Sequence, residues 1–341
     1  MQYSISKVVK IAAACTLSTA VLMPAAQAQV SERTLKAAAS VPADHPVVIG
    51  LKKFSDIVNK NSGGKIKIRV YPNAQLGNDM QAQSALQGGT LDFFLGATTT
   101  LGGIVKDFGV YDFPFLFNKP EEADAVLDGP FGKKLEAKLP EKGLVSLGYW
   151  ENGYRNVTNS KHPIVKWEDL GGLKIRTMQS SVLLDVFNNF NANAVPLAFS
   201  EVYSALETRA VDAQENPNAL IESSKFDDVQ KYISLTRHVY NPFILLMSKK
   251  TWDKLSADEK KLFSDAATEA KLFERRLSRE NDAKALAELK KRGMQVNDFS
   301  DAERARMAER TKPVIAKHST QIGAAVVNDL QAEIAKVRGA K

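Results

Sequence analysis

Short strand patterns alternate with helix patterns along most of this sequence. The clearest strand is "KIKIRVYP", residues 65–72, in which three β-branched residues alternate with three basic ones. That period of two is typical of a strand with one buried face. The preceding segment, 45–64, has a helical pattern that ends at the pair Gly63-Gly64. Strands exchanged with helices in this order predict an α/β fold, a mostly parallel sheet flanked by helices.

The alternation occurs in two groups, which predicts two lobes. We expect three strands in the first group, at 34–40, 65–72 and 91–97, and helices at 45–64 and 78–89. The second group has strand patterns at 143–158, 173–177 and 192–199, and helix patterns at 181–190 and 200–208. Ligands of such sheets bind outside the carboxyl ends of the strands. Arg176 ends a strand and is therefore expected to face that crevice.

A long segment without glycine or proline, 256–292, predicts one helix that braces both lobes. Ser256 and Glu259 have the spacing of a capping box at its start. An unbroken helix of this length would span roughly 55 Å, longer than one lobe is wide. Two shorter helices with a bend near Phe273 are the alternative. A second capping box at Ser300 starts the C-terminal helical part, and the last residues, 334–341, are expected to fray.

The first 28 residues have the features of a cleaved signal peptide. Lys7 and Lys10 precede or interrupt an apolar run from 8 to 23, and Ala26-Gln27-Ala28 follows as a small-residue cleavage site. The apolar run is shorter than the ~20 residues of a membrane-spanning helix, so an uncleaved anchor is the weaker alternative. The only cysteine, Cys15, lies in this segment. We therefore expect an exported, periplasmic mature protein without disulfides or a cysteine nucleophile, and not inserted in the membrane.

Charge and motifs exclude several classes of protein. Removing the leader, which holds two lysines and no acid, lowers the formal net charge from +7 to +5, and basic and acidic residues are interspersed. Nucleic acid is therefore not an expected partner. The four histidines are widely separated, and neither an HExxH metal motif nor a GxSxG nucleophile motif nor a glycine-rich phosphate loop occurs. No catalytic residue, metal site or organic cofactor is predicted.

Seven motifs together resemble one known family, the periplasmic solute-binding subunits of TRAP (tripartite ATP-independent periplasmic) transporters. In sequence order they are "YPNAQLGND", "GTLDFF", "FGVYDFPFLF", "WENGYRNVTNSKHPI", "GLKIRTMQSS", "PLAFSEVYSALETRAVDAQENP" and "KFDDVQKYISLT". The resemblance implies a two-lobed Venus-flytrap protein that closes on a small organic acid and delivers it to a membrane permease driven by a sodium gradient. A long helix spanning both lobes is also a family feature.

We assign residues 29–152 and 242–281 to lobe I, 153–241 and 282–330 to lobe II, and 331–341 to a C-terminal tail.

The resemblance also implies which residues bind the ligand. Arg176 matches the family arginine that pairs with the ligand carboxylate, and a guanidinium suits that role because its planar fork makes two parallel hydrogen bonds. Arg155 matches a second basic position, Asn216 an amide contact, and Gln179 a polar position three residues after the key arginine. Two nearby arginines repel each other, so an empty site is expected to stay open.

Each of these residues also has a structural alternative. Arg176 could bridge a surface acid such as Asp169, Arg155 could form a peripheral salt bridge, and Asn216 before Pro217 could be a turn or cap residue.

Six further residues are candidates for the ligand crevice. Phe199 and Trp150 are expected as walls of the pocket, with core packing as the alternative. Asp44 and His45 follow the first strand, and Thr98 and Thr99 follow the third, so all four are expected at strand ends that face the crevice. A helix-start role explains Asp44 nearly as well.

The motifs favour a sugar acid as the ligand. The sialic-acid branch of the family has an acidic residue after the strand that matches "LDFF", whereas this protein has "LGATTT". The segments "MQSS" and "WENGYRNVTNSK" are more similar to branches that take sugar acids such as glucuronate, or four-carbon dicarboxylates such as malate or succinate. Polar Thr98, Thr99 and Gln179 suit a polyhydroxylated acid. A sensor partner of a signalling protein and a periplasmic enzyme remain alternatives of another class.

Overall fold

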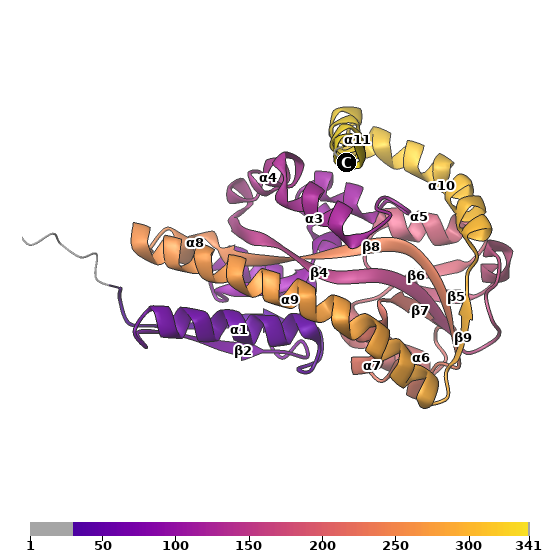
Figure 1. Ribbon diagram of the computed structural model, residues 1–341, viewed down its shortest axis with the longest axis horizontal. Coiled ribbons are helices and arrows are strands. Elements are labelled where there is room, and N and C mark those ends of the chain that lie inside the picture. Colours follow the sequence, from indigo (N-terminus) through magenta and orange to yellow (C-terminus); the bar gives the residue numbers. More distant parts are fainter. Residues whose placement is uncertain (1–29, 340–341) are drawn as a thin grey trace, which may run out of the picture.

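The computed structural model describes residues 30–339, and these form one nine-stranded mixed sheet with helices on both faces (Figure 1). The expected leader over 1–28 lies outside the described residues. The strands are β1 (Arg33–Ala39), β2 (Ile66–Tyr71), β3 (Phe93–Ala97), β4 (Leu144–Asn159), β5 (Lys174–Thr177), β6 (Asn193–Pro196), β7 (Ala213–Asn216), β8 (Tyr232–Ser248) and β9 (Gln295–Asp298).

The helices expected at 45–64, 78–89, 181–190, 200–208 and 256–292 are present, and the structure adds helices at 120–128, 130–136, 218–223 and 249–252 that the sequence did not predict. The α-helices are α1 (Pro46–Asn61), α2 (Asp79–Gly88), α3 (Pro120–Asp128), α4 (Pro130–Glu136), α5 (Ser181–Asn189), α6 (Val202–Glu207), α7 (Asn218–Ser223), α8 (Lys249–Trp252), α9 (Ala257–Lys291), α10 (Asp301–Ile322) and α11 (Ala324–Gly339). Short 3-10 helices are η1 (Thr98–Gly103), η2 (Lys106–Asp112), η3 (Pro140–Lys142), η4 (Trp167–Leu170), η5 (Phe199–Glu201) and η6 (Phe226–Asp228).

The strand order confirms an α/β fold with two groups of parallel strands, but it places both groups in one sheet, whereas we expected one sheet in each lobe. Along the sheet the order is β2-β1-β3-β8-β4-β7-β5-β6, with β9 paired to β8. The outer groups are parallel, as predicted, but β4 and β8 run antiparallel through the middle and join the groups. We call the part around β1, β2 and β3 the first lobe and the part around β5, β6 and β7 the second lobe. Sequence reasoning did not identify β8, because its 17 residues, almost all buried, have no alternating pattern.

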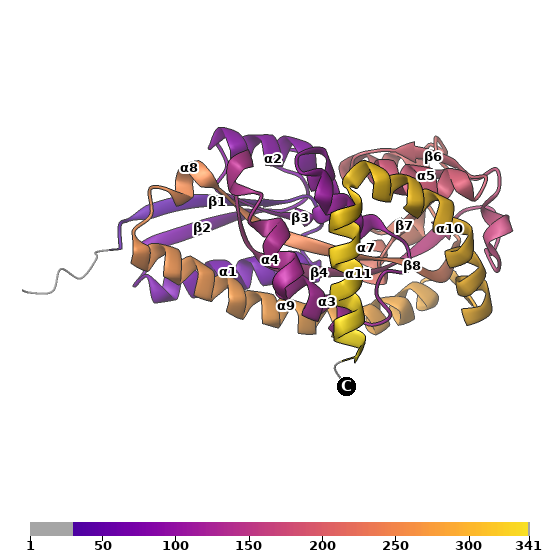
Figure 2. The same cartoon turned by 90° about the horizontal axis from the view of Figure 1, so that it is seen from above.

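The long helix is unbroken, as expected, so the bend near Phe273 does not occur. Ser256 and Glu259 form the predicted capping box: the Glu259 backbone N–H donates to Ser256 Oγ at 3.2 Å, and Glu259 Oε2 accepts from Ser256 N at 2.9 Å. α9 contacts α1 in the first lobe, crosses β4 and reaches α7 near the second lobe (Figures 1 and 2). It therefore braces both lobes.

Two expectations at the end of the protein have different outcomes. Ser300 is the N-cap residue of α10, as predicted, and accepts a hydrogen bond from Glu303 N at 3.1 Å, but the Glu303 side chain does not return the second hydrogen bond of a capping box. The frayed tail is wrong for the described residues, because α11 continues to Gly339 and buries Leu330 and Ile334 against the hydrophobic core. An apolar stripe therefore holds this helix in place.

Two of the predicted lobe boundaries, at 152/153 and 241/242, fall inside β4 and β8. There Gly153 pairs with Asn241 beside a register shift. The division into lobes at these positions remains a prediction. Among residues 30–339, no helix combines the length and apolar character needed to cross a bilayer.

Candidate ligand-binding site

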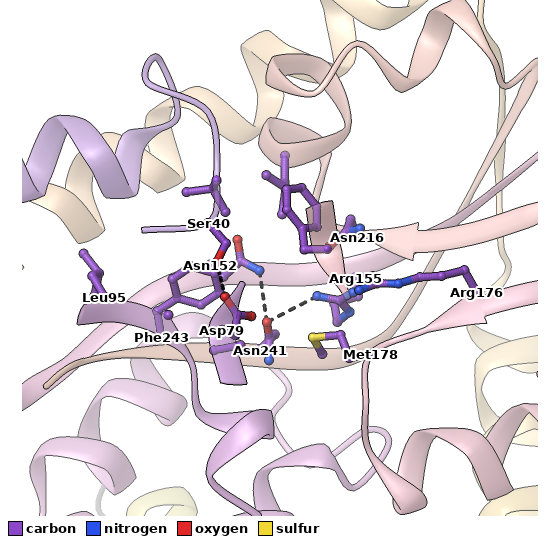
Figure 3. A pocket seen from close by; sticks show the side chains of 15 residues that line it. Ser40, Asp79, Leu95, Asn152, Arg155, Arg176, Met178, Asn216, Asn241 and Phe243 are labelled. Carbon is purple, nitrogen blue, oxygen red and sulfur yellow. Dashed lines mark hydrogen bonds between the residues drawn. The ribbon is translucent and has the colours of Figure 1, made fainter. Parts of the chain in front are cut away.

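A cavity lies between the lobes at the carboxyl ends of strands, where the sequence placed it (Figure 3). The first lobe contributes Ser40 after β1, Ala97 at the end of β3, and Asp79 at the start of α2. The second lobe contributes Arg176, Met178, Phe199 and Asn216. The joining strands β4 and β8 contribute Asn152, Arg155, Asn241 and Phe243. The polar lining is thus made of arginines, amides, one hydroxyl and one carboxylate.

Arg176 is buried in this cavity without a carboxylate partner among the described residues. Its Nε and Nη2 both donate to the Leu197 carbonyl, at 3.0 and 2.7 Å, whereas Nη1 is buried and has no hydrogen-bond partner. The surface bridge to Asp169 does not form, because Asp169 Oδ2 accepts instead from two backbone N–H groups, those of Val165 and Lys166. One edge of the guanidinium, in a residue that lines the cavity, therefore has unused hydrogen-bond donors.

The surroundings of Arg176 make its charge costly. Burial, together with the charge of the neighbouring Arg155, lowers the pKa of Arg176 to about 10, although the carboxylates of Glu215 and Asp79 oppose this shift. A buried cation without a direct carboxylate partner is destabilising, and an anion that completes its hydrogen bonds removes that penalty.

Arg155 is in the cavity wall, but its charge is already neutralised. Its guanidinium forms a buried ion pair with Glu215, with Nη2 2.7 Å from Glu215 Oε1, and its Nη1 donates to Asn241 Oδ1 at 3.2 Å. His238 Nε2 lies 3.2 Å from Glu215 Oε2. Burial alone would raise the pKa of Glu215, but Arg155 and His238 lower it to about 2. The peripheral salt bridge considered for Arg155 is thus a buried one, and Glu215 offsets the expected repulsion between the two arginines.

Asn216 and Phe199 reach the cavity as predicted. Asn216 ends β7 and its Nδ2 donates to Gln214 Oε1 at 2.5 Å. It does not cap α7, whose N-cap residue is Pro217. Phe199 starts η5 and packs on Phe226 with ring centroids 6.1 Å apart. Both residues belong to the second lobe, on the same side as Arg176.

Three candidates lie away from the cavity. Trp150 is fully buried in the core, beside Gly50 of α1, so the core alternative holds for it. Gln179 and Asp44 are exposed, and neither lines the cavity. In place of Gln179, the side chain of Met178 enters from the same loop.

His45 and the two threonines have structural roles behind the cavity. His45 caps α1, because its Nδ1 accepts from Val47 N at 3.3 Å, and burial lowers its pKa to about 3. Thr98 donates to the Pro242 carbonyl at 3.2 Å. Thr99 accepts from Asn241 Nδ2 at 3.2 Å and so supports a residue that does line the cavity.

Sequence reasoning missed Ser40, Asp79, Asn152 and Asn241. Ser40 directly follows β1, so the rule that ligands bind at strand ends could have identified it. The Asp79 carboxylate is hydrogen-bonded to Ser40 Oγ, and burial raises its pKa, opposed by that hydrogen bond and by the charge of Arg176. Asn152 Nδ2 donates to Asn241 Oδ1 at 3.0 Å (Figure 3). Both asparagines lie inside the long central strands, for which the sequence carries no positional signal.

The arrangement can hold an anion, and among the described residues no cluster of three or more His, Cys, Asp or Glu side chains could hold a metal ion.

Comparison with known proteins identifies the family. The model of the family "bacterial extracellular solute-binding protein, family 7" (DctP) matches residues 37–321. The 2,3-diketo-L-gulonate-binding periplasmic protein YiaO of Escherichia coli is 39% identical over 260 residues, which is 74% of this protein and 79% of YiaO. The crystal structure of the sugar acid binding protein DctPAm from Advenella mimigardefordensis, in complex with galactonate, is 42% identical with a TM-score of 0.89, covering 90% of this protein and 99% of DctPAm.

A TRAP periplasmic solute-binding protein from Ochrobactrum anthropi, whose structure has a C-terminus bound in the ligand-binding pocket, is 50% identical with a TM-score of 0.82, covering 91% of this protein and 97% of that relative.

Proposed function

The protein belongs to the DctP family of TRAP-transporter solute-binding proteins, and we propose that it captures a sugar acid such as glucuronate or galactonate and delivers it to a TRAP permease for sodium-gradient-driven uptake. Proteins of this family are periplasmic transport components that bind organic acids, and they are not enzymes. The proposed place of action is the periplasm, after removal of residues 1–28.

The observation that carries the proposal is the unpartnered Nη1 of Arg176. A buried guanidinium whose Nε and Nη2 already bond Leu197 O offers its remaining donors to a ligand in the cavity. A carboxylate is the group that best fits a guanidinium in shape and charge. The relative whose pocket holds a C-terminus supports this, because the C-terminus of a polypeptide also presents a carboxylate.

The charge balance of the cavity favours one carboxylate and several hydroxyls over two carboxylates. Arg155 is already paired with Glu215, so Arg176 is the cavity cation that a ligand can neutralise. Asp79 contributes a carboxyl to the other side of the cavity, where a second ligand carboxylate would meet like charge (Figure 3). Asn152, Asn216 and Asn241 supply amides that can bond ligand hydroxyls.

Two relatives also support a sugar acid, because DctPAm is a sugar acid binding protein in complex with galactonate and YiaO is a 2,3-diketo-L-gulonate-binding protein.

The test is calorimetric titration of the mature protein, unfolded and refolded to remove any co-purified ligand, with a matched set of acids. Galactonate and galactarate differ only in the distal group, a hydroxymethyl or a second carboxylate. We expect glucuronate or galactonate to bind at least about tenfold more tightly than galactarate or succinate, since like charge at Asp79 costs on the order of 1.4 kcal/mol or more. Tighter binding of succinate or galactarate would assign the site to dicarboxylates, and binding of none of these acids would reject the proposed ligand class.

A further inference from the structure

Asp112 lies outside the cavity but connects its two sides. It ends η2, which follows β3 and η1 of the first lobe, and its side chain is almost completely buried. Oδ1 accepts from Thr99 Oγ1 at 2.7 Å, and Oδ2 accepts from Ser180 Oγ at 2.7 Å. Thr99 belongs to the first lobe, whereas Ser180 is the N-cap residue of α5 in the second lobe. One carboxylate is therefore held by hydroxyls from both lobes.

On the first-lobe side, a series of hydrogen bonds leads from Asp112 into the cavity. Thr99 donates its proton to Asp112 and accepts from Asn241 Nδ2 at 3.2 Å. Asn241 Oδ1 in turn accepts from Asn152 Nδ2 at 3.0 Å and from Arg155 Nη1 at 3.2 Å (Figure 3). All donors in this series point towards the Asp112 carboxylate, and hydrogen bonds aligned in one direction strengthen one another.

On the second-lobe side, Asp112 fixes the loop that follows the strand of the key arginine. Ser180 lies four residues after Arg176, and Met178 between them lines the cavity. The Ser180 hydroxyl donates to Asp112 and accepts from Leu183 N at 3.4 Å, so it caps α5 and contacts the other lobe at once. A shift of this loop away from η2 would move Arg176 relative to Asn241 and Asn152.

We propose that Asp112, with Thr99 and Ser180, is an interlobe latch: a set of positioning residues that holds the closed cavity together without touching the ligand. This inference rests on the proposed function in one respect, that ligand binding occurs at Arg176. The latch stabilises the closed state through two hydrogen bonds to a buried carboxylate, and ligand affinity depends on it because the ligand needs that state.

The test distinguishes the hydrogen bond of Ser180 to Asp112 from its role as the N-cap residue of α5. Ser180→Gly removes the hydroxyl but keeps an acceptable N-cap residue, since glycine is among the residues preferred at this position and its substitution costs little stability. Ser180→Thr keeps the hydroxyl. We expect the dissociation constant for galactonate to be about tenfold larger in Ser180→Gly, mostly through faster dissociation, and close to the wild-type value in Ser180→Thr.

In ligand-free protein we expect the two variants to melt within about 2 °C of each other. Asp112→Asn keeps only one acceptor oxygen for the hydroxyls of Thr99 and Ser180, and it is expected to weaken binding about as much as Ser180→Gly, with the double variant little weaker than either. Equal affinity in wild type and Ser180→Gly would overturn the latch, as would additive effects of the two substitutions.

A second measurement does not depend on the ligand's identity. Spin labels at Asp56→Cys in α1 and Glu207→Cys in α6, both exposed, report the distance between the lobes, and the mature protein has no other cysteine. Ser180→Gly and Asp112→Asn should shift the distances to longer values than Ser180→Thr. If wild type binds none of the tested acids, the proposed ligand class is wrong, but the latch can still be tested by these distances. Distances that are the same in Ser180→Gly, Asp112→Asn and wild type would reject the latch.

Discussion

Replacing Arg176 by methionine should strongly weaken ligand binding and, at the same time, stabilise the ligand-free protein. The first effect follows from the open Nη1 of Arg176 in the cavity. Truncating one partner of a buried charged pair costs about 2–5 kcal/mol, which is a rise of roughly 30-fold to several thousandfold in the dissociation constant. Methionine keeps an unbranched side chain of similar length, so the cavity wall is retained.

The second effect follows from the cost of the buried charge. A pKa lowered from 12.5 to about 10 corresponds to about 3 kcal/mol against the charged form in the folded protein. Removing the guanidinium also removes its contacts to Leu197 O, and because Nε and Nη2 share this one acceptor we treat them as a single charge-assisted hydrogen bond worth about 1.5–3 kcal/mol. The balance predicts a ligand-free variant more stable by about 1 kcal/mol, or about 2 °C in melting temperature.

Thermal unfolding with and without saturating ligand, together with calorimetry, tests both effects. Ligand at about 100 times the wild-type dissociation constant should stabilise wild type by about 2.7 kcal/mol and Arg176→Met by less than about 1 kcal/mol, so the order of the two melting temperatures reverses. Arg69→Met, at an exposed position of β2, is the matched control and should change neither quantity. An unchanged dissociation constant in Arg176→Met would refute the carboxylate pairing. A ligand-free variant that melts well below wild type would refute the assignment of a net cost to the charge.

Three further predictions concern the cavity and the core. Burial raises the pKa of Glu274 to about 8, so the protonated side chain contributes its full stability below about pH 4.5, and this contribution is lost as the pH rises through 8. Glu274→Gln should therefore have a higher melting temperature than wild type at about pH 9 and a similar one at about pH 5. A difference in melting temperature that does not change with pH would contradict this. Asp79→Asn should shift the galactonate-to-galactarate affinity ratio towards galactarate by about tenfold or more, since like charge is removed; calorimetry showing an unchanged ratio would exclude Asp79 from ligand selection. A Cβ at Gly50 would lie 2.6 Å from Trp150 Cζ3, so Gly50→Ala should destabilise the protein by about 1–3 kcal/mol in denaturant unfolding, whereas Gly88→Ala, with open space around it, should not.

Local patterns in the sequence predicted the elements whose cause is local. The alternation at 65–72 predicted β2, with Ile66 and Ile68 buried, and the Ser256 capping box predicted the start of α9. The position of Arg176 at the end of a strand placed it in the crevice, because the carboxyl ends of parallel strands meet at one edge of a sheet. The frayed tail failed because the burial of Ile334 depends on the core residues against which α11 packs.

The sequence by itself determined the strand and helix periods, the helix caps, the arginine at a strand end and the motifs that resemble a solute-binding family. Only the tertiary structure decided which charges are compensated. Arg155 and Glu215 are 60 residues apart in the sequence yet form a buried pair, whereas within residues 30–339 the neighbouring Arg176 has no carboxylate partner. It also joined the two groups of strands into one sheet through β4 and β8. Periods and caps depend on neighbours a few residues away, but compensation of a buried charge depends on contacts that only folding brings together.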